Sequence, residues 1–401
     1  MVDLTLSEEQ LALQRTARDF ARSEIAPLVS DRKSGAAPAD LDKRTLGVFR
    51  RGVALGFTRL MIPEQYGGLG GSCMDHVIIA EELAMGDISV AADLFNLATT
   101  MPQLFLTAGD EALAARWLSH LAGDGGYILA GCLSEPNIAG SELFCPDPDP
   151  KFGIRTHAQR DGDHYIINGN KSAFITNAGV ADYYFVMART DLNQALRESI
   201  SIFLVPRDTP GLHIGKRTEL IGWHLSRHAE VTLENLRVPA ANRLGAEGAG
   251  GAIFAQAPAM AVGLAACFVG LARSAYEYAL AYAQERRSCG KALIEHQAVA
   301  LKLADMAVDL QAARLMVWDA ALASDSDPVT ACTTKGPAAK TIAVDTAIRN
   351  AQRATEILGA YGVTAEYSTG DMLNDAWVGY ACDFTRDMLR LSIVPFLAPQ
   401  N

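Results

Sequence analysis

The spacing of apolar residues divides the chain into three zones. Residues 1–126 and 241–401 carry apolar side chains at intervals of three and four, as on one face of a helix, whereas residues 127–240 hold short runs rich in Ile, Val, Tyr, Phe and Thr. The Asp161-Gly162 pair between two of these runs is typical of a hairpin turn. We therefore predict an α+β chain, mostly α, with an N-terminal helical domain, a middle antiparallel β-domain and a C-terminal bundle of four helices.

The same pattern predicts the limits of single helices. Ser7 and Gln10 have the spacing of a capping box at the start of the first helix. In the C-terminal zone, the apolar residues predict helices at about 250–286, 294–324, 335–359 and 371–395.

Composition indicates a globular chain and argues against some partners. The 401 residues are 49% hydrophobic and 20% charged, and the net charge of −11 disfavours binding to nucleic acid. The seven cysteines contain no CxxC pair, so we predict neither a disulfide framework nor a metal site. A reducing, cytoplasmic compartment fits this pattern, and the opening MVDLTLSEEQ has no basic start or apolar core of an export signal.

One uncharged segment, residues 252–272, is long enough to cross a membrane. It consists mainly of Ala and Gly, contains Gln256 and Pro258, and has few Leu or Ile residues to favour lipid. We therefore expect no membrane partner but one long helix buried by other helices, whose small residues let its neighbours approach closely.

The stretch CLSEPNIAGSE, residues 132–142, breaks off an apolar, strand-like run. Hydroxyls, a carboxylate and a loop with exposed amides follow, and no helical pattern comes next. Taken alone, Ser134 and Ser141 suit the ordinary turn chemistry at the end of a strand. They equally suit a flat, electron-poor ligand that lies against the loop.

Five blocks, in order along the chain, carry a resemblance to a known family. LSEPNIAGSE resembles the pattern T-E-P-x-A-G-S-D, and NGNKSAFITNAGVADYYFVMAR resembles NGxKxWITNxxxAxxxxVxAR. The other blocks are VTLENLRVPAANRLGAEGAG, YAQERRSCGKALIEHQAVALKLADM, and the pair AKTIAVDTAIRNAQRATEILGAYGV and GYACDFTRDMLR. From about residue 4 to residue 393, the chain resembles the acyl-CoA dehydrogenases, which are FAD-dependent α,β-desaturases of acyl thioesters.

The resemblance implies that the loop after the first strand runs along the flavin of FAD. The residues at this edge of the ring would be Cys132, Ser134, Gly140 and Ser141, with Ser141 toward the pyrophosphate. Hydrogen-bond donors placed there stabilise the negative charge of the reduced ring and raise its potential.

A second segment is expected on the other face of the flavin. Phe174, Ile175 and Thr176 match the family's Trp-Ile-Thr, in which the threonine hydroxyl meets flavin N5. Phe174 keeps an apolar cover but lacks the indole N–H. Without the resemblance, Phe174 reads equally well as an aromatic residue of the β-core.

A third group is implied to reach the FAD of a neighbouring subunit. Arg286 matches the arginine that pairs with the pyrophosphate, and its planar guanidinium suits that contact. Gln297, Glu356, Gly359 and Gly362 match the remaining positions on the dinucleotide. The resemblance therefore implies a homotetramer or homodimer with shared FAD sites, although a solvated helix end would also explain Arg286.

The reaction requires a carboxylate near the substrate α-carbon. Aligning DAWVGYACDFTRDMLR with the family's Y-E-G-T motif places Asp383 at the catalytic Glu and Thr385 at the Thr, which we group with the cofactor-binding residues. Asp is shorter than Glu by one methylene, about 1.5 Å. Arg390 follows seven residues later, and on a continuous helix it could keep Asp383 ionised. The alternative is a purely structural ion pair of Asp383 and Arg390.

Asp93 is a second candidate, because its helix borders the acyl pocket in the family. It could face a polar or ring-shaped acyl group or take a proton itself. An ordinary acidic residue on a helix surface is the simpler explanation.

The chain departs from the family where coenzyme A is held. Pro258 and Ala261 stand at the positions of an Asp and an Arg in the long helix, and residues 143–153 form an added, acidic loop. These departures favour a carrier-protein thioester, or a substrate that is not a thioester.

We accordingly expect an FAD-dependent dehydrogenase of acyl thioesters that passes electrons to an electron-transfer flavoprotein or to oxygen. The alternatives are nitroalkane oxidation or flavin monooxygenation on the same fold, or a catalytically weakened flavoprotein.

Overall fold

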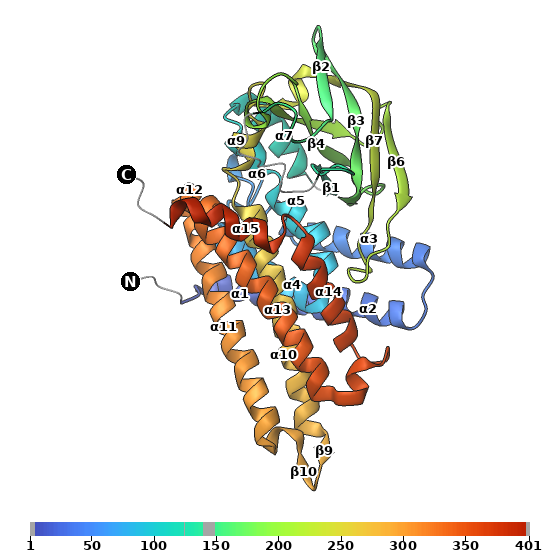
Figure 1. The fold of residues 1–401 in the computed structure, drawn as a ribbon, viewed down its shortest axis with the longest axis vertical. Coiled ribbons are helices and arrows are strands. Elements are labelled where there is room, and N and C mark those ends of the chain that lie inside the picture. Colours follow the sequence, from blue (N-terminus) through green and yellow to red (C-terminus); the bar gives the residue numbers. More distant parts are fainter. Residues whose placement is uncertain (1–4, 124, 139–148, 398–401) are drawn as a thin grey trace.

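The computed structural model describes residues 5–123, 125–138 and 149–397. In Figure 1 the β-sheet lies at one end of the molecule, and the long C-terminal helices run side by side away from it. The N-terminal zone is helical, as predicted, and its capping box of Ser7 and Gln10 is present. Its main helices are α1 (Glu8–Phe20), α2 (Ala26–Lys33), α3 (Pro38–Ala54), α4 (Cys73–Gly86), α5 (Leu97–Thr100), α6 (Gln103–Thr107) and α7 (Glu111–Leu121).

The middle zone forms one sheet with the order β6-β7-β3-β2-β4-β5-β8, and β1 pairs with β4. The predicted hairpin joins β2 to β3, with Asp161 opposite His164 and Gly162 at a positive φ of 62°. The strands are β1 (Leu129–Cys132), β2 (His157–Asp161), β3 (His164–Thr176), β4 (Tyr183–Arg189), β5 (Ile200–Pro206), β6 (Leu212–Arg217), β7 (His228–Pro239) and β8 (Arg243–Leu244).

The predicted β-domain is present, but its sheet is mixed and not antiparallel throughout. β1 runs parallel to β4, and His157 of β2 also pairs in parallel with Arg189. Neither pair is joined by a tight turn, so the connection does not force the strands to run in opposite directions.

The C-terminal zone packs around α10 (Ala259–Glu285), together with α11 (Gln297–Ser326), α13 (Gly336–Leu358), and α14 (Thr369–Ala381) with α15 (Arg386–Ile393). α10 is long and apolar enough to cross a membrane, but 78% of its most apolar window is buried inside the molecule. Its small residues allow close packing, because a Cβ on Gly270 would lie 2.3 Å from the carbonyl oxygen of Glu81. The expectation of a buried core helix is confirmed.

Two predicted helices are interrupted. The helix expected at 250–286 is split into α9 (Gly250–Phe254) and α10, because Pro258 stands at the N-cap of α10. The helix expected at 371–395 is broken between α14 and α15, where Asp383 and Phe384 have positive φ angles of 44° and 71°. Neither residue is a glycine, so the break could not be seen in the sequence.

Candidate active site

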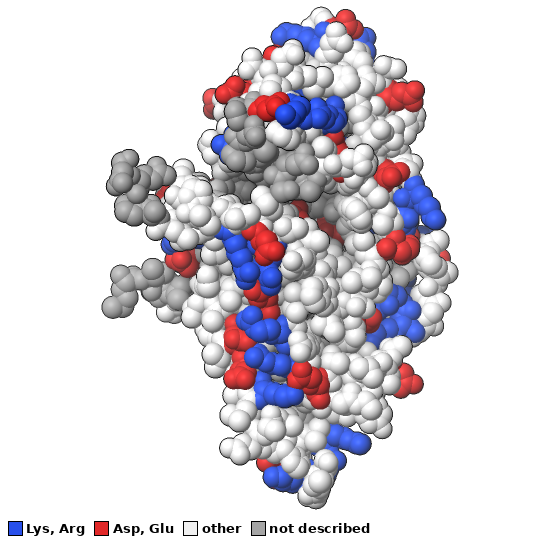
Figure 2. Space-filling view, viewed as in Figure 1, with Lys and Arg blue, Asp and Glu red and all other residues white. Residues whose placement is uncertain are grey.

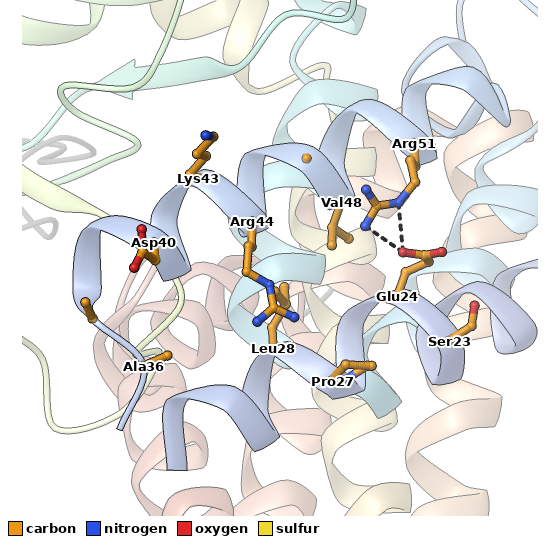
Figure 3. A pocket seen from close by; sticks show the side chains of 12 residues that line it. Ser23, Glu24, Pro27, Leu28, Ala36, Asp40, Lys43, Arg44, Val48 and Arg51 are labelled. Atoms are coloured by element: carbon orange, nitrogen blue, oxygen red, sulfur yellow. Dashed lines mark hydrogen bonds and ion pairs between the residues drawn. The ribbon is translucent and has the colours of Figure 1, made fainter. Parts of the chain in front are cut away.

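A groove on the N-terminal domain lies away from the predicted chemistry. It is lined by residues of α2, α3 and the π-helical turn η1 (Ala21–Ile25), and Figure 3 shows Arg51 and Glu24 pointing toward one another within it. These two side chains form an ion pair of 2.6 Å. None of the predicted site residues lines the groove, so we place the candidate site elsewhere.

The loop after β1 is held by a buried carboxylate. Glu135 accepts hydrogen bonds from the backbone N–H groups of Arg155 (2.6 Å) and Thr156 (2.9 Å), and Lys171 Nζ lies 3.1 Å from Oε1. Burial alone would raise the pKa of Glu135, but Lys171 and these hydrogen bonds bring it below its usual value. The carboxylate in this loop is therefore a structural anchor.

The same loop presents Ser134 to β3. The Ser134 hydroxyl lies 2.7 Å from that of Ser172, and the Ser134 carbonyl accepts from the Ser172 N–H at 2.9 Å. The side chain of Cys132 is fully buried, so only its backbone could meet a ligand. Gly140 and Ser141 lie outside the described residues.

The end of β3 places the second predicted segment close by. Phe174 is 61% exposed, an unusual setting for a large aromatic ring, whereas Ile175 is buried in the core. Thr176 Oγ1 lies 3.3 Å from Nε2 of His228, at the start of β7. Phe174 and Thr176 are thus placed where they could contact a flat ligand, while the side chain of Ile175 between them packs into the core.

Asp93 is not on the surface. It lies in the π-helical segment η4 (Val90–Asn96), is 4% exposed, and has its Oδ2 buried without a hydrogen bond, 3.7 Å from His228 Nε2. The Asn177 side-chain amide ties this segment to the sheet, because it donates to the carbonyls of Asp93 (2.5 Å) and Leu129 (2.9 Å). The simpler expectation for Asp93, a helix-surface acid, was wrong.

Burial suppresses charge on both members of this pair. It raises the pKa of Asp93 well above its usual range; the Ser226 hydroxyl acts in the opposite direction, and the charge of Asp383 raises it further. Burial also lowers the pKa of His228 to about 4. Burial therefore favours a protonated carboxyl group on Asp93 and a neutral imidazole on His228. His228 was not among the predicted site residues, because only the fold brings it to Asp93.

Asp383 lies in the break between α14 and α15. Its side chain is exposed and has no hydrogen bond or ion pair with the described residues. The backbone of the break is bound by Lys340 of α13, whose Nζ lies 2.5 Å from the carbonyl oxygens of Cys382 and Asp383 and 3.5 Å from that of Phe384.

The expected pairing of Arg390 with Asp383 was wrong. Arg390 donates to Asp345 of α13 at 3.1 Å and lies 3.7 Å from Asp387, while Arg386 also binds Asp345, at 3.0 Å. The helix is interrupted at residues 382–385, so a spacing of seven does not place Asp383 and Arg390 on one face. Arg390 instead anchors α15 to α13, and Thr385 caps α15 by accepting from the Met388 N–H at 3.4 Å.

The remaining predicted FAD residues lie far from this region. In Figure 1, the hairpin that follows Arg286 is at the end of the helical bundle opposite the sheet. Arg286 stacks over the ring of Tyr361 at 5.4 Å, and Glu356 forms an ion pair with Lys302 at 2.5 Å. Gln297 and Gly359 are exposed at the same end, whereas Gly362 is buried. The structure therefore separates the predicted cofactor residues into two groups.

Comparison with known families agrees with this architecture. Three family models cover most of the chain: the N-terminal domain of the acyl-CoA dehydrogenases matches residues 7–124, the middle domain 130–236 and the C-terminal domain 253–396. The chain belongs to the acyl-CoA dehydrogenase family.

Individual relatives support the assignment over the full length. An acyl-CoA dehydrogenase of Bacillus subtilis (strain 168) is 33% identical over 396 residues, which cover 98% of each chain. The solved butyryl-CoA dehydrogenase of Megasphaera elsdenii has a TM-score of 0.88 and 30% identity, covering 99% of this chain and 100% of that chain. The prolyl acyl carrier protein oxidase AnaB has a TM-score of 0.84 and 26% identity, covering 98% of this chain and 100% of that chain.

The protein is thus an FAD-dependent oxidoreductase that converts acyl thioesters to their α,β-enoyl products. The described residues suit the cofactor, because Ser134, Phe174 and Thr176 present hydroxyls and an exposed ring at neighbouring strand ends. When bound, FAD accepts the two electrons and the hydrogen that leave the β-carbon.

Proposed function

We propose that Asp383 is the base that removes the α-proton of the acyl thioester. The main support for this proposal is the difference in exposure between the carboxyl groups of Asp383 and Asp93. The side chain of Asp383 is exposed and unpaired among the described residues, whereas Asp93 is buried, and its burial raises the pKa of its carboxyl group and favours the protonated form. Burial also shields Asp93 from a substrate, whereas the exposed carboxylate of Asp383 can approach the α-proton directly, as a general base must.

In this proposal each residue of the site has a separate role. Asp383 takes the α-proton, Thr176 and Ser134 orient the cofactor through their hydroxyls, and Phe174 covers its face and limits access of water. Asp93 and His228 supply a buried polar wall beside Thr176, on which burial disfavours charge. This wall would suit an acyl group with a polar atom better than a plain alkyl chain.

We further propose that the acyl group arrives on a carrier protein. Pro258 is buried at the N-cap of α10 and Ala261 is a methyl side chain, so neither can hold a pantetheine arm by charge or hydrogen bond. The similarity to a prolyl acyl carrier protein oxidase points in the same direction.

The two separated groups of cofactor residues support a shared FAD site in a homodimer or homotetramer. Arg286, Gln297 and Glu356 belong to the end of α10, the start of α11 and the end of α13, which lie at the opposite end of the molecule from β1 and β3 in Figure 1, so one FAD contacting both groups would require two subunits. α11 also carries exposed apolar residues seven positions apart, Leu301, Val308 and Leu315, as expected for a helix that packs on another chain.

The electron acceptor is proposed to be an electron-transfer flavoprotein or oxygen. A cytoplasmic location is supported by the cysteines, since all six that the structure describes are free.

Anaerobic titration of the bound flavin with matched acyl groups on CoA and on a carrier protein tests the function. We expect bleaching by thioesters, with the carrier-bound form effective at lower concentration. Bleaching by nitroalkanes but by no thioester would contradict the proposal.

A further inference from the structure

Lys340 is an unusual side chain in the described part of the chain. It is 1% exposed, and within the described residues its ammonium binds backbone carbonyls and no carboxylate. A buried positive charge is unfavourable unless dipoles or an anion compensate it. The buried ammonium of Lys340 must therefore be compensated by the dipoles of the groups around it.

Its partners are three successive carbonyl oxygens. Lys340 Nζ lies 2.5 Å from that of Cys382, 2.5 Å from that of Asp383 and 3.5 Å from that of Phe384. A lysine ammonium has three N–H donors and no acceptor, so one side chain can serve all three carbonyls. Carbonyls of successive residues converge on one point only when the backbone curls tightly around it.

The backbone does curl at this point. Asp383 and Phe384 have φ angles of 44° and 71°, in the left-handed region that residues other than glycine rarely adopt. Such conformations persist only when the surroundings over-determine them. The ammonium of Lys340 supplies that constraint from inside the curl.

The segment is bound to α13 at a second point. Asp345 of α13 binds Arg386 at 3.0 Å and Arg390 at 3.1 Å, which holds α15 against the same helix. The first point fixes the backbone of Asp383, and the second fixes the helix that follows. α13 therefore acts as a rigid support for the one exposed carboxylate of the site.

We propose that Lys340 is a positioning residue, which holds Asp383 in the left-handed turn that aims its carboxylate at the substrate. The inference rests on the proposed role of Asp383 as the base. A base one methylene shorter than Glu tolerates little displacement, since about 1 Å of misplacement can cost on the order of a hundredfold in rate. A turn fixed by an internal cation suits this requirement.

The test uses Lys340→Met in the FAD-loaded protein, with Lys335→Met as the matched control. Lys335 is nearby in sequence but pairs at 2.8 Å with Asp319 at the surface. We expect kcat of Lys340→Met to fall by about ten- to a hundredfold, with KM and FAD content close to wild type. Amide hydrogen exchange over residues 382–386 should become faster. Lys335→Met should match wild type in all of these measurements.

Wild-type kcat together with wild-type exchange over residues 382–386 in Lys340→Met would overturn the proposal. If the Met variant does not fold, Lys340→Arg keeps the charge with a longer reach, and it should show an intermediate loss of kcat; wild-type values would again overturn it. The exchange measurement does not depend on the substrate. Loss of protection without any thioester activity in the wild type would contradict the proposed function and leave the turn-fixing role of Lys340 established.

Discussion

His228 Nε2 lies 3.7 Å from the buried Oδ2 of Asp93, and this pair joins the N-terminal helices to the start of β7. The same imidazole nitrogen faces the hydroxyl of Thr176 at 3.3 Å. Burial favours the uncharged form of both side chains, and the imidazole of His228 contributes a hydrogen bond to Thr176.

Substitution of Asp93 by Asn should therefore change the reaction little. The amide keeps the shape of the carboxyl group and the uncharged form that burial favours, so we expect the rate of anaerobic bleaching at neutral pH to fall by less than about tenfold, that is about 1.4 kcal/mol. Rapid-mixing absorbance of the flavin measures this rate. A loss of several thousandfold in Asp93→Asn, with FAD still bound, would move the base into the first domain.

Replacing Arg286 by Ala should weaken FAD binding. Loss of a charge-assisted hydrogen bond costs about 1.5–3 kcal/mol, which corresponds to roughly ten- to a hundredfold in affinity. The ratio of flavin to protein absorbance after dialysis measures occupancy. Arg287→Ala is the control, because Arg287 is its exposed neighbour and donates at 2.8 Å to the carbonyl of Gly290 within the hairpin. Equal occupancy in the two variants would count against a shared FAD site.

Asp375→Asn should make the protein more stable in alkali. Asp375 accepts from the Trp223 N–H at 2.6 Å, and burial, with the nearby charge of Asp87, raises its pKa to about 8. The folded-state pKa lies above the unfolded value of about 3.9, so the stabilisation is complete below about pH 4 and is lost as the pH rises through about 8. The amide keeps the hydrogen bond and removes this loss.

We expect the free energy of unfolding of Asp375→Asn to exceed that of wild type by ~1–3 kcal/mol at about pH 9, since one pKa unit corresponds to about 1.4 kcal/mol. Urea denaturation across this range measures the difference. A wild-type advantage that grows with pH would show that the carboxylate form is stabilised instead.

Substitution of Gly270 by Ala should destabilise the core. The added Cβ would lie 2.3 Å from the Glu81 carbonyl oxygen, so α4 and α10 would have to separate, at a cost of about 1–3 kcal/mol. Gly370→Ala in α14 is the control, because a Cβ there would meet nothing within 4 Å. Urea midpoints should fall for the first variant and stay level or rise for the second. Equal midpoints for the two variants would mean that α4 and α10 can accommodate the added methyl group without separating.

Much of the fold followed from the sequence, because periodicity reports which faces are buried. The capping box at Ser7, the turn at Asp161-Gly162 and the buried Ala-rich helix depend on neighbours in sequence or on local composition. The parallel pairing of β1 with β4 and the turn at Asp383 depend instead on distant contacts. Because apolar residues have helical spacing both before and after Asp383, the sequence predicted one continuous helix at about 371–395.

The residues of the candidate site that belong to sequence motifs could be predicted, whereas the partners that only the fold brings to them could not. Motif comparison identified Ser134, Thr176 and Asp383 as candidates. The partners that define their settings, His228 and Lys340, lie elsewhere in the chain and belong to ordinary strand and helix patterns. Arg390 was misplaced for a different reason. Its spacing of seven residues from Asp383 would put both side chains on one face of a continuous helix, but the helix is interrupted between them.

The most direct test of the account is single-turnover bleaching of the flavin by an acyl thioester that reduces the wild type, measured anaerobically with Asp383→Asn and with Asp387→Asn as control. Asp387 is an exposed carboxylate on α15, beside Arg386 and Arg390. We expect Asp383→Asn to keep its FAD but to bleach at least about a thousandfold more slowly, while Asp387→Asn behaves as wild type. Bleaching at the wild-type rate by Asp383→Asn would contradict the account.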